Sequence, residues 1–271
     1  MLLVVDIGNT NIVFGVYADA TLEHTLRVST VATRTADEVT VLLQELAEVR
    51  GIRFADIRGA ILSCVVPQAT ESMTEALRSL LPVEPLVVGP GLKTGMPILY
   101  DSPRDVGADR IVNAVAAFDR IKGAVIVVDF GTATTFDCIS QRGEYLGGVI
   151  APGLLVSLDG LLERAAKLVR VEVAEPPRVL GRNTTHALQS GMIHGHASLV
   201  DGVVHRLNAE LETPSAVLAT GGLATLIAKH STTIQAVDPH LTLDGLRLIY
   251  GRNQTKAPSS PTASRRVPRG G

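Results

Sequence analysis

The chain has 271 residues, of which 46% are hydrophobic and 19% are charged, and its formal net charge is −2. This length is enough for one large domain or for two smaller domains with their own cores. The near-neutral charge gives no basic footprint for nucleic acid, and an aromatic content of 3% argues against a surface that stacks single-stranded bases.

The chain also lacks the marks of a secreted or membrane protein. No apolar run reaches the ~18 residues that a membrane span needs, and Met1 leads straight into a predicted strand rather than into a signal peptide. Cys64 and Cys138 lie in apolar runs without the spacing of metal ligands. We therefore expect reduced core thiols in a cytoplasmic protein that does not bind a membrane.

The first half of the chain is predicted to be a strand meander followed by helices and strands. A capping box at Thr35–Glu38 marks the start of its first helix. Glycine, proline and polar residues over 89–103 predict a long loop, and long loops in compact domains are often functional. We expect strands at 2–7, 11–17, 22–28, 59–63 and 86–88, and helices after residue 35, over 68–80 and over 107–121.

The second half repeats this pattern. We expect strands at 124–130, 133–140, 144–150, 216–219 and near 236, and helices at 154–169, 185–212, 222–230 and 243–250. Two similar halves, residues 1–122 and 123–252, predict a duplicated α/β fold with two mixed sheets and a cleft between them. The tail from 253 to 271 contains proline, serine and three arginines, and we expect it to be disordered.

One phrase occurs near the start of both halves. An apolar strand runs into Asp6-Ile7-Gly8-Asn9-Thr10, another runs into Asp129-Phe130-Gly131-Thr132, and a further strand follows each. Glycine lets backbone N–H groups approach a phosphate closely, and successive N–H groups in a tight turn bind anions. One copy alone is typical of an ordinary β-hairpin. Two copies favour a nucleotide held between two phosphate-binding hairpins.

The aspartate in each hairpin needs a separate explanation, because a carboxylate repels phosphate. A cation or a water molecule between the carboxylate and the phosphate resolves the conflict. Other nucleotide motifs are missing, since the chain has neither G-x-x-x-x-G-K-[ST] nor G-x-G-x-x-G after its first strand. The letters D-F-G at 129–131 have no protein-kinase catalytic loop before them.

Asp109 and Arg110 lie at the expected N-terminus of the helix that Gly107 opens. A helix N-terminus lowers the pKa of a carboxylate and favours anions. Asp109 is therefore a candidate to orient or deprotonate a hydroxyl, and Arg110 is a candidate clamp for a carboxylate or phosphate. The alternative is that Asp109 only stabilises the helix terminus.

Two other groups have ordinary structural interpretations. His194 and His196 stand two residues apart with no third ligand nearby, so they do not share a helix face and we interpret them as surface or interface histidines. Thr184 and Thr185 follow Gly181-Arg182-Asn183, which is typical of a helix cap.

The motifs follow one another in a defined order. They are Asp6-Ile7-Gly8-Asn9-Thr10-Asn11, Tyr100-Asp101-x-Pro103, Gly107-Ala108-Asp109-Arg110, Asp129-Phe130-Gly131-Thr132-Ala133-Thr134, Gly147-Gly148 with Pro152-Gly153, and Asn183-Thr184 with Ser190-Gly191. In this order they resemble the type III pantothenate kinases of the acetate and sugar kinase/Hsp70/actin superfamily. The resemblance covers residues 1 to about 250, and the block at 107–110 is its specific part.

The resemblance implies an actin-like, ribonuclease-H-like fold that phosphorylates the 4′-hydroxyl of pantothenate with ATP, the first step of coenzyme A biosynthesis. It implies Asp109 as general base, Asp129 as ligand of a monovalent cation, K⁺ or NH₄⁺, and Mg²⁺ bound with ATP. The implied ATP-binding residues are Asp6, Ile7, Gly8, Asn9, Thr10, Asn11, Ile12, Val13 and Thr132. The implied pantothenate-binding residues are Tyr100, Gly107, Ala108, Asp109, Arg110 and Thr184.

Three further implications concern the surroundings of the site. Thr184 is expected to reach the pocket from the other subunit of a homodimer, because the family builds this pocket at its interface. Val65 is expected to add an apolar wall. The turn Thr220-Gly221-Gly222 resembles the superfamily's glycine turn on the adenosine side.

Other functions remain open from the sequence. A non-catalytic nucleotide-binding regulator with the same fold is the main alternative, because fold does not fix function. An actin-like assembly protein and a kinase for another hydroxy acid are weaker alternatives. The intact pair Asp109-Arg110 favours an enzyme.

Overall fold

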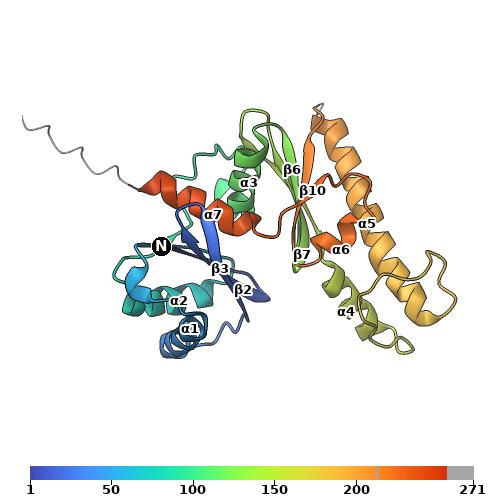
Figure 1. Cartoon of the computed structure of the whole chain (residues 1–271). Helices are drawn as coiled ribbons and strands as arrows, with labels where there is room; N and C mark the ends of the chain where they lie inside the picture. The colour runs from blue at the N-terminus through green and yellow to red at the C-terminus, as the bar shows by residue number, and fades with distance from the viewer. Residues whose placement is uncertain (212, 255–271) are drawn as a thin grey trace, which may run out of the picture.

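Two five-stranded sheets of the same design form the framework of the protein (Figure 1). The structure is a computed structural model that describes residues 1–211 and 213–254. The first sheet has the order β3-β2-β1-β4-β5 and the second has the order β8-β7-β6-β9-β10. In each sheet the first three strands of the half are antiparallel, and the remaining two run parallel to the central strand. The predicted duplication is therefore confirmed strand by strand.

The helices and strands follow the predicted order. The first half contains β1 Leu2–Ile7, β2 Asn11–Ala18, β3 Thr21–Ser29, α1 Ala36–Arg50, η1 Phe54–Asp56, β4 Gly59–Cys64, α2 Pro67–Leu80, β5 Leu86–Val87, η2 Pro103–Asp105 and α3 Ala108–Ile121. The second contains β6 Val125–Phe130, β7 Ala133–Ile139, β8 Tyr145–Pro152, α4 Leu154–Arg164, α5 Thr184–Leu211, β9 Ala216–Gly221, α6 Ala224–Ala228, β10 Ala236–Val237 and α7 Leu241–Asn253.

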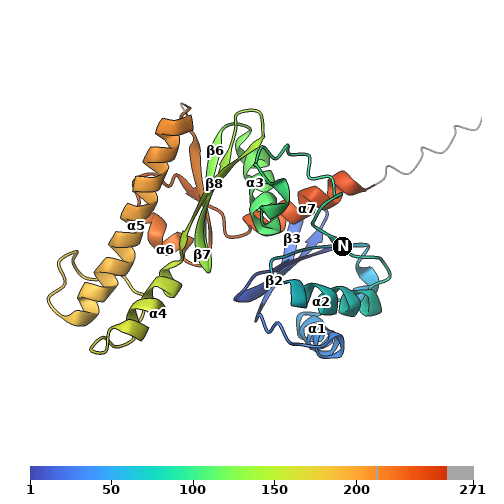
Figure 2. The ribbon, with the colours of Figure 1, turned by 180° about the vertical axis from the view of Figure 1, so that it is seen from behind.

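Helices cover both faces of each sheet. In the first sheet α1 and α2 pack on the outer face, and in the second sheet α4, α5 and α6 lie on the outer side (Figures 1 and 2). The helices α3 and α7 lie between the two sheets and cross one another. Helix α7 follows the strands of the second half but packs against β1, β4 and β2, so the last helix of the described part joins the first sheet.

Local signals explain where several elements begin and end. The capping box is present, since Thr35 Oγ1 accepts from the N–H of Glu38 and the Glu38 carboxylate accepts from the N–H of Thr35. Gly51 ends α1 in the left-handed conformation that glycine adopts without strain. Gly107 caps α3, as the sequence predicted.

Helix α4 is shorter than predicted. The expected helix over 154–169 ends at Arg164, and the chain then turns and runs without regular structure to α5. Beyond the turn Val171 is buried and Val173 packs against the core of the second sheet. These β-branched residues suit extended backbone better than helix, and the packing of Val173 against the core requires the chain to leave the helical path before it.

The remaining structural expectations have mixed outcomes. Cys138 is buried, Cys64 is half-buried, and both are free thiols. Asn253 is the last residue of α7 rather than the start of a tail, because α7 extends three residues beyond the predicted end at 250. The rest of the predicted tail from 255 lies outside the described residues. None of the helices in the described part of the chain combines the length and apolar character needed to cross a bilayer.

The close crossing of α3 and α7 gives a test of the fold. A methyl group at Gly245 would overlap the carbonyl oxygen of Val112 on α3. We expect Gly245→Ala to lower the free energy of unfolding by about 1–3 kcal/mol, the usual cost of overpacking. Gly251→Ala on the same helix meets no atom and should instead stabilise by up to about 1 kcal/mol. Thermal unfolding of both variants checks this, and equal effects would contradict the close packing.

Candidate active site

The two Asp-x-Gly turns meet in space. Thr10 Oγ1 of the first turn lies 2.9 Å from Thr132 Oγ1 of the second, although the residues are 122 positions apart. In each turn the glycine N–H closes the hairpin, from Gly8 to the Asn11 carbonyl and from Gly131 to the Ala133 carbonyl, both at 3.0 Å. The glycine N–H groups are thus engaged, contrary to the expectation that they face a phosphate. The exposed tips around Thr10 and Thr132 are the part of the turns that faces outward.

Residues that flank the first turn belong to the strand core. Ile7 and Ile12 are buried and pair with one another across β1 and β2. Asn11 and Val13 are half-buried. The side chains of Ile7 and Ile12 support the hairpin, so these two residues can meet a ligand only through their backbone.

Asp6 stands at the end of β1 and is held by a neutral donor. Ser63 on the neighbouring strand β4 is fully buried and donates from Oγ to Asp6 Oδ1 at 2.6 Å. Burial raises the pKa of Asp6 to about 6, the hydrogen bond from Ser63 lowers it, and the charge of Asp109 raises it further. Asp6 is therefore a carboxylate largely removed from water and without a cationic partner among the described residues.

Asp129 stands at the corresponding end of β6. The buried Asn113 of α3 donates from Nδ2 to Asp129 Oδ2 at 3.0 Å, and Asn113 Oδ1 accepts from Thr242 Oγ1 of α7 at 2.7 Å. Burial raises the pKa of Asp129 to about 7, and the charges of Asp109 and Asp6 add to this shift. Gly221 lies beside Asp129, where a Cβ atom would stand 2.5 Å from Oδ1.

Asp109 occupies the first turn of α3 and is half-buried. Its Oδ1 accepts from the N–H of Arg110 at 2.8 Å. The helix N-terminus lowers the pKa of Asp109 as the sequence predicted, but the net shift is upward. Burial raises the pKa and outweighs the lowering by the helix backbone and by Arg110. A carboxylate of this kind is a better proton acceptor than a fully solvated one.

Asp6, Asp109 and Asp129 thus come from β1, α3 and β6 and influence one another electrostatically. Among residues 1–211 and 213–254, no cluster of three or more His, Cys, Asp or Glu side chains is arranged to hold a metal ion. A cation at Asp129 would therefore take its other oxygen ligands from elsewhere. The raised pKa of about 7 at Asp129 fits a carboxylate whose ionised form would be stabilised by a cation.

Tyr100, from the loop over 89–103, and Arg110, from α3, both pack against β8. The 89–103 loop joins the sheet through a parallel bridge between Ile98 and Tyr145. A Cβ atom at Gly147 would meet the ring of Tyr100 at 3.5 Å, and one at Gly148 would lie 2.8 Å from Nη2 of Arg110. Gly148 therefore leaves room for Arg110, whereas a Cβ atom at Gly147 would only touch Tyr100, and Gly107 and Ala108 lead directly into Arg110.

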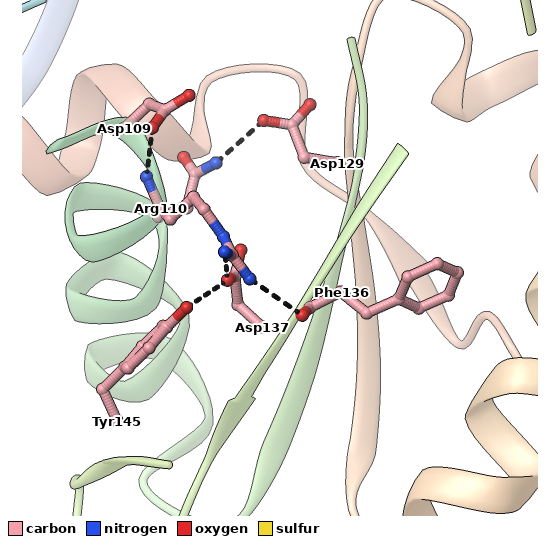
Figure 3. Close-up of polar contacts among 7 residues, drawn as sticks. Asp109, Arg110, Asp129, Phe136, Asp137 and Tyr145 are labelled. Carbon is pink, nitrogen blue, oxygen red and sulfur yellow. Dashed lines mark hydrogen bonds and ion pairs between the residues drawn. The ribbon is translucent and has the colours of Figure 1, made fainter. Parts of the chain in front are cut away.

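Arg110 is buried, and its guanidinium group donates hydrogen bonds to two acceptors on β7 (Figure 3). Its Nε donates to Asp137 Oδ1 at 2.7 Å, and Nη2 donates to the Phe136 carbonyl at 3.4 Å. Tyr145 Oη donates to the same Asp137 oxygen at 2.7 Å. Asp109 and Asp129 lie at the other end of this group of residues.

Thr184 is not near these residues within one chain. It is exposed at the start of α5, which packs on the outer face of the second sheet, whereas α3 packs on the inner face. Figures 1 and 2 agree that this end of α5 lies far from α3. Val65 follows β4 and bonds to the Ile7 carbonyl, and Thr220 pairs with Asp129 in register.

The sequence reasoning missed the residues that hold the site from behind. Ser63, Asn113, Asp137 and Tyr145 are polar groups inside predicted strands or helices, and their spacing carried no motif. The interpretation of His196 as a surface or interface residue is wrong, because it is buried and its Nε2 lies 2.8 Å from Thr134 Oγ1. His194 is half-buried and packs against His230.

Comparison with known proteins identifies the family. The sequence model of type III pantothenate kinases matches residues 2–206. The chain belongs to the type III pantothenate kinase family. A type III pantothenate kinase from Geotalea uraniireducens is 52% identical over 254 residues, which are 94% of this chain and 99% of that protein. One from Myxococcus xanthus is 51% identical over 253 residues, 93% of this chain and 99% of that protein.

Solved structures support the fold of this kinase. A Baf family protein from Campylobacter jejuni superposes with a TM-score of 0.54 at 19% identity, covering 93% of this chain and 98% of that one. The activator of 2-hydroxyisocaproyl-CoA dehydratase from Clostridium difficile, solved with bound ADPNP, gives 0.51 at 11% identity, covering 96% and 99%. The predicted actin-like, duplicated fold is confirmed.

The raised pKa of Asp129 predicts a pH-dependent cost to stability. Since the folded-state value of about 7 exceeds the unfolded value near 4, ionising Asp129 destabilises the kinase as pH rises between these values. We expect Asp129→Asn to gain stability over wild type between pH 5 and 7, by on the order of 1 kcal/mol per pH unit, with no further gain above pH 7.

Asp201→Asn is the matched control for this measurement. Burial acts to raise the pKa of Asp201, but hydrogen bonds from Ser231, Thr232 and Thr233 lower it to about 2. Its contribution is therefore constant between pH 5 and 8, and its loss should destabilise by a constant amount. Urea unfolding across this range separates the variants, and parallel curves for Asp129→Asn and wild type would refute the shift.

Proposed function

We propose that this chain transfers the γ-phosphoryl group of ATP to the 4′-hydroxyl of pantothenate, the first step of coenzyme A biosynthesis. Membership of the type III pantothenate kinase family, over nearly the whole chain, carries this proposal. The proximity of the Gly107–Arg110 block to two joined hairpin turns supports it, because phosphoryl transfer needs an acceptor site beside a phosphate site. We also place the reaction in the cytoplasm, as expected for a kinase that draws on cellular ATP.

Asp109 is proposed as the general base. It starts α3 at the end of the site where Asp6 and Asp129 also lie, and burial raises its pKa toward the range where a carboxylate accepts a proton efficiently. In this role Asp109 accepts the proton of the pantothenate hydroxyl as that oxygen attacks the γ-phosphorus. The reaction needs little other covalent chemistry from the protein, so positioning and charge stabilisation do most of the work.

The two turns are proposed to hold ATP. The exposed hydroxyls of Thr10 and Thr132 are only 2.9 Å apart and can donate to phosphate oxygens from both halves. The segment from Asp6 to Val13 is assigned to the phosphates, with Ile7 and Ile12 acting through backbone groups. Mg²⁺ bound with the nucleotide neutralises phosphate charge in such reactions.

The acceptor pocket is assigned to Tyr100, Gly107, Ala108 and Arg110. Tyr100 is partly exposed and, like Arg110, packs against the strand β8. A guanidinium group binds a carboxylate through two parallel hydrogen bonds. Arg110 therefore suits the carboxylate of pantothenate, while Gly107 leaves the approach to Asp109 open.

Asp129 is proposed to bind the monovalent cation, K⁺ or NH₄⁺. The carboxylate lies next to the second turn, and its raised pKa reflects burial and the nearby negative charges of Asp109, Asp6 and Asp137. A cation there would supply positive charge close to the phosphates. If so, K⁺ should raise the thermal stability of wild type at pH 8 and leave Asp129→Asn unchanged.

A homodimer is proposed to complete the pocket with Thr184. Large apolar side chains are exposed on one stretch of the second half, on β8, α4 and the segment before α5, and apolar surface of this extent is typical of interfaces. They are Ile150, Leu155, Val156, Leu161, Val169, Val179 and Leu180. Since Thr184 is remote from Arg110 in its own chain, a partner chain on this surface is the way for it to reach a pocket.

Replacement of Asp109 tests the reaction. We expect Asp109→Asn to reduce kcat for ATP-dependent formation of phosphopantothenate by about 10²–10⁴-fold, because the hydroxyl loses its proton acceptor. ATP affinity should change little. Asp105→Asn, an exposed carboxylate four residues earlier, is the control and should keep full activity. A folded wild type with no turnover in the presence of K⁺, or a fully active Asp109→Asn, would refute the proposal.

Mixed dimers test the shared pocket. Asp109→Asn and Thr184→Arg should each be inactive as pure dimers, because every site contains the damaged residue. When the two are co-expressed, half of the dimers are mixed and each mixed dimer keeps one intact site, so about a quarter of the wild-type activity should return. Thr185→Arg, the neighbouring exposed threonine, is the control for Thr184→Arg. If activity stays near zero in mixed dimers isolated with two affinity tags, Thr184 does not act across the interface.

A further inference from the structure

We infer that Asp137 and Tyr145 are positioning residues that fix the guanidinium group of Arg110 so that its free edge faces the acceptor. This inference rests on the proposed function, because it assigns Arg110 to the acceptor's carboxylate. Neither Asp137 nor Tyr145 is among the site residues that the sequence predicted, yet together they set the orientation of Arg110. Neither Asp137 nor Tyr145 touches the substrate in this assignment.

Asp137 is a fully buried carboxylate whose contacts are concentrated on one oxygen. Oδ1 accepts from Arg110 Nε and from Tyr145 Oη, both at 2.7 Å. Oδ2 has no hydrogen-bond partner among the described residues. Tyr145 is also fully buried, and the guanidinium carbon of Arg110 lies 6.0 Å from the centre of its ring. Tyr145 therefore fixes Asp137 in place, and Asp137 fixes Arg110 (Figure 3).

This contact decides which edge of Arg110 remains available. Nε is taken by Asp137, and Nη2 makes only a long bond of 3.4 Å to the Phe136 carbonyl. No described residue accepts from Nη1. A guanidinium group presents two edges for bidentate binding, and the edge formed by Nη1 and Nη2 is the one left for a carboxylate. Gly148 keeps the space beside Nη2 clear of any side chain.

The arrangement is unlike one that serves stability alone. A buried ion pair generally contributes little net stability, since the desolvation of both charges offsets their attraction. Burial accordingly raises the pKa of Asp137 to about 6 despite the arginine beside it. A carboxylate here costs stability but orients a planar cation, which an apolar residue of the same size cannot do.

Asp137→Asn is the main test. Asparagine keeps the shape and can still accept from both donors, but it removes the charge that holds Nε. We expect the KM for pantothenate to rise about tenfold, as for the loss of a charge-assisted hydrogen bond, while the KM for ATP stays within about twofold and kcat changes less than the pantothenate KM. Tyr145→Phe, which removes one hydroxyl, should raise the pantothenate KM by a smaller factor.

A matched pair on the same helix provides the control. Arg120 near the end of α3 donates from Nη1 to the buried carboxylate of Asp238 at 2.5 Å, far along the helix from Arg110. Asp238→Asn should therefore leave both KM values unchanged, even if it costs stability. A double-mutant cycle then tests whether Asp137 acts through Arg110. If it does, adding Asp137→Asn to Arg110→Gln should not lower kcat/KM for pantothenate further.

The outcomes separate the inference from the proposed function. Wild type without pantothenate-dependent turnover overturns both. An active wild type whose Asp137→Asn variant is folded and keeps the pantothenate KM overturns the inference alone, as does a further loss in the Arg110→Gln background. If Asp137→Asn does not fold, Tyr145→Phe decides the question, and an unchanged pantothenate KM in that variant overturns the inference.

Discussion

Mutual repulsion among Asp6, Asp109 and Asp129 is the constraint on which the rest of the site depends. The three carboxylates come from two strand ends and one helix start, and burial raises the pKa of each. The fold holds them with neutral donors: the Ser63 hydroxyl, the Asn113 amide and a backbone N–H. None of the three forms an ion pair with an arginine or lysine among the described residues, and the charge of Arg110 only partly offsets the raised pKa of Asp109, so their charge stays available to a proton or a cation.

Asp137 differs from these three aspartates because its charge is paired with an arginine. Its charge is consumed by Arg110 and its orientation is fixed by Tyr145, so it serves the arginine rather than a ligand. The polar residues that hold the aspartates are thus of two kinds. Ser63 and Asn113 are neutral and leave the carboxylate charge unpaired, whereas Arg110 neutralises the charge of Asp137. The partner makes the difference, since burial raises the pKa of all four aspartates.

The sequence predicted the features that depend on neighbouring residues, but it did not predict contacts between residues far apart in the chain. The hairpins, the capping box and the start of α3 depend on neighbouring residues, and each lies where the pattern predicted it. Asp137 could not be found in this way, because it contacts Arg110 across 27 residues and looks like any polar residue within a strand. The end of α4 and the burial of His196 also depended on packing against the second sheet, which periodicity along the chain does not reveal.

The duplicated halves have the same strand order but different chemistry at equivalent positions. Ser63 pairs with Asp6 in the first sheet, and Thr220 pairs with Asp129 in the second, each on the parallel strand beside the aspartate. In the first half the hydroxyl at this position binds the carboxylate directly. For Asp129 the donor comes instead from Asn113 on α3 of the first half, and Gly221 leaves the other carboxylate oxygen without a side chain beside it. Asp6 is thus held within its own sheet, whereas Asp129 is held by a helix that also carries Asp109. A shift of α3 would move Asp109 and the donor to Asp129 together, so Asp129, unlike Asp6, is coupled to the helix that carries Asp109.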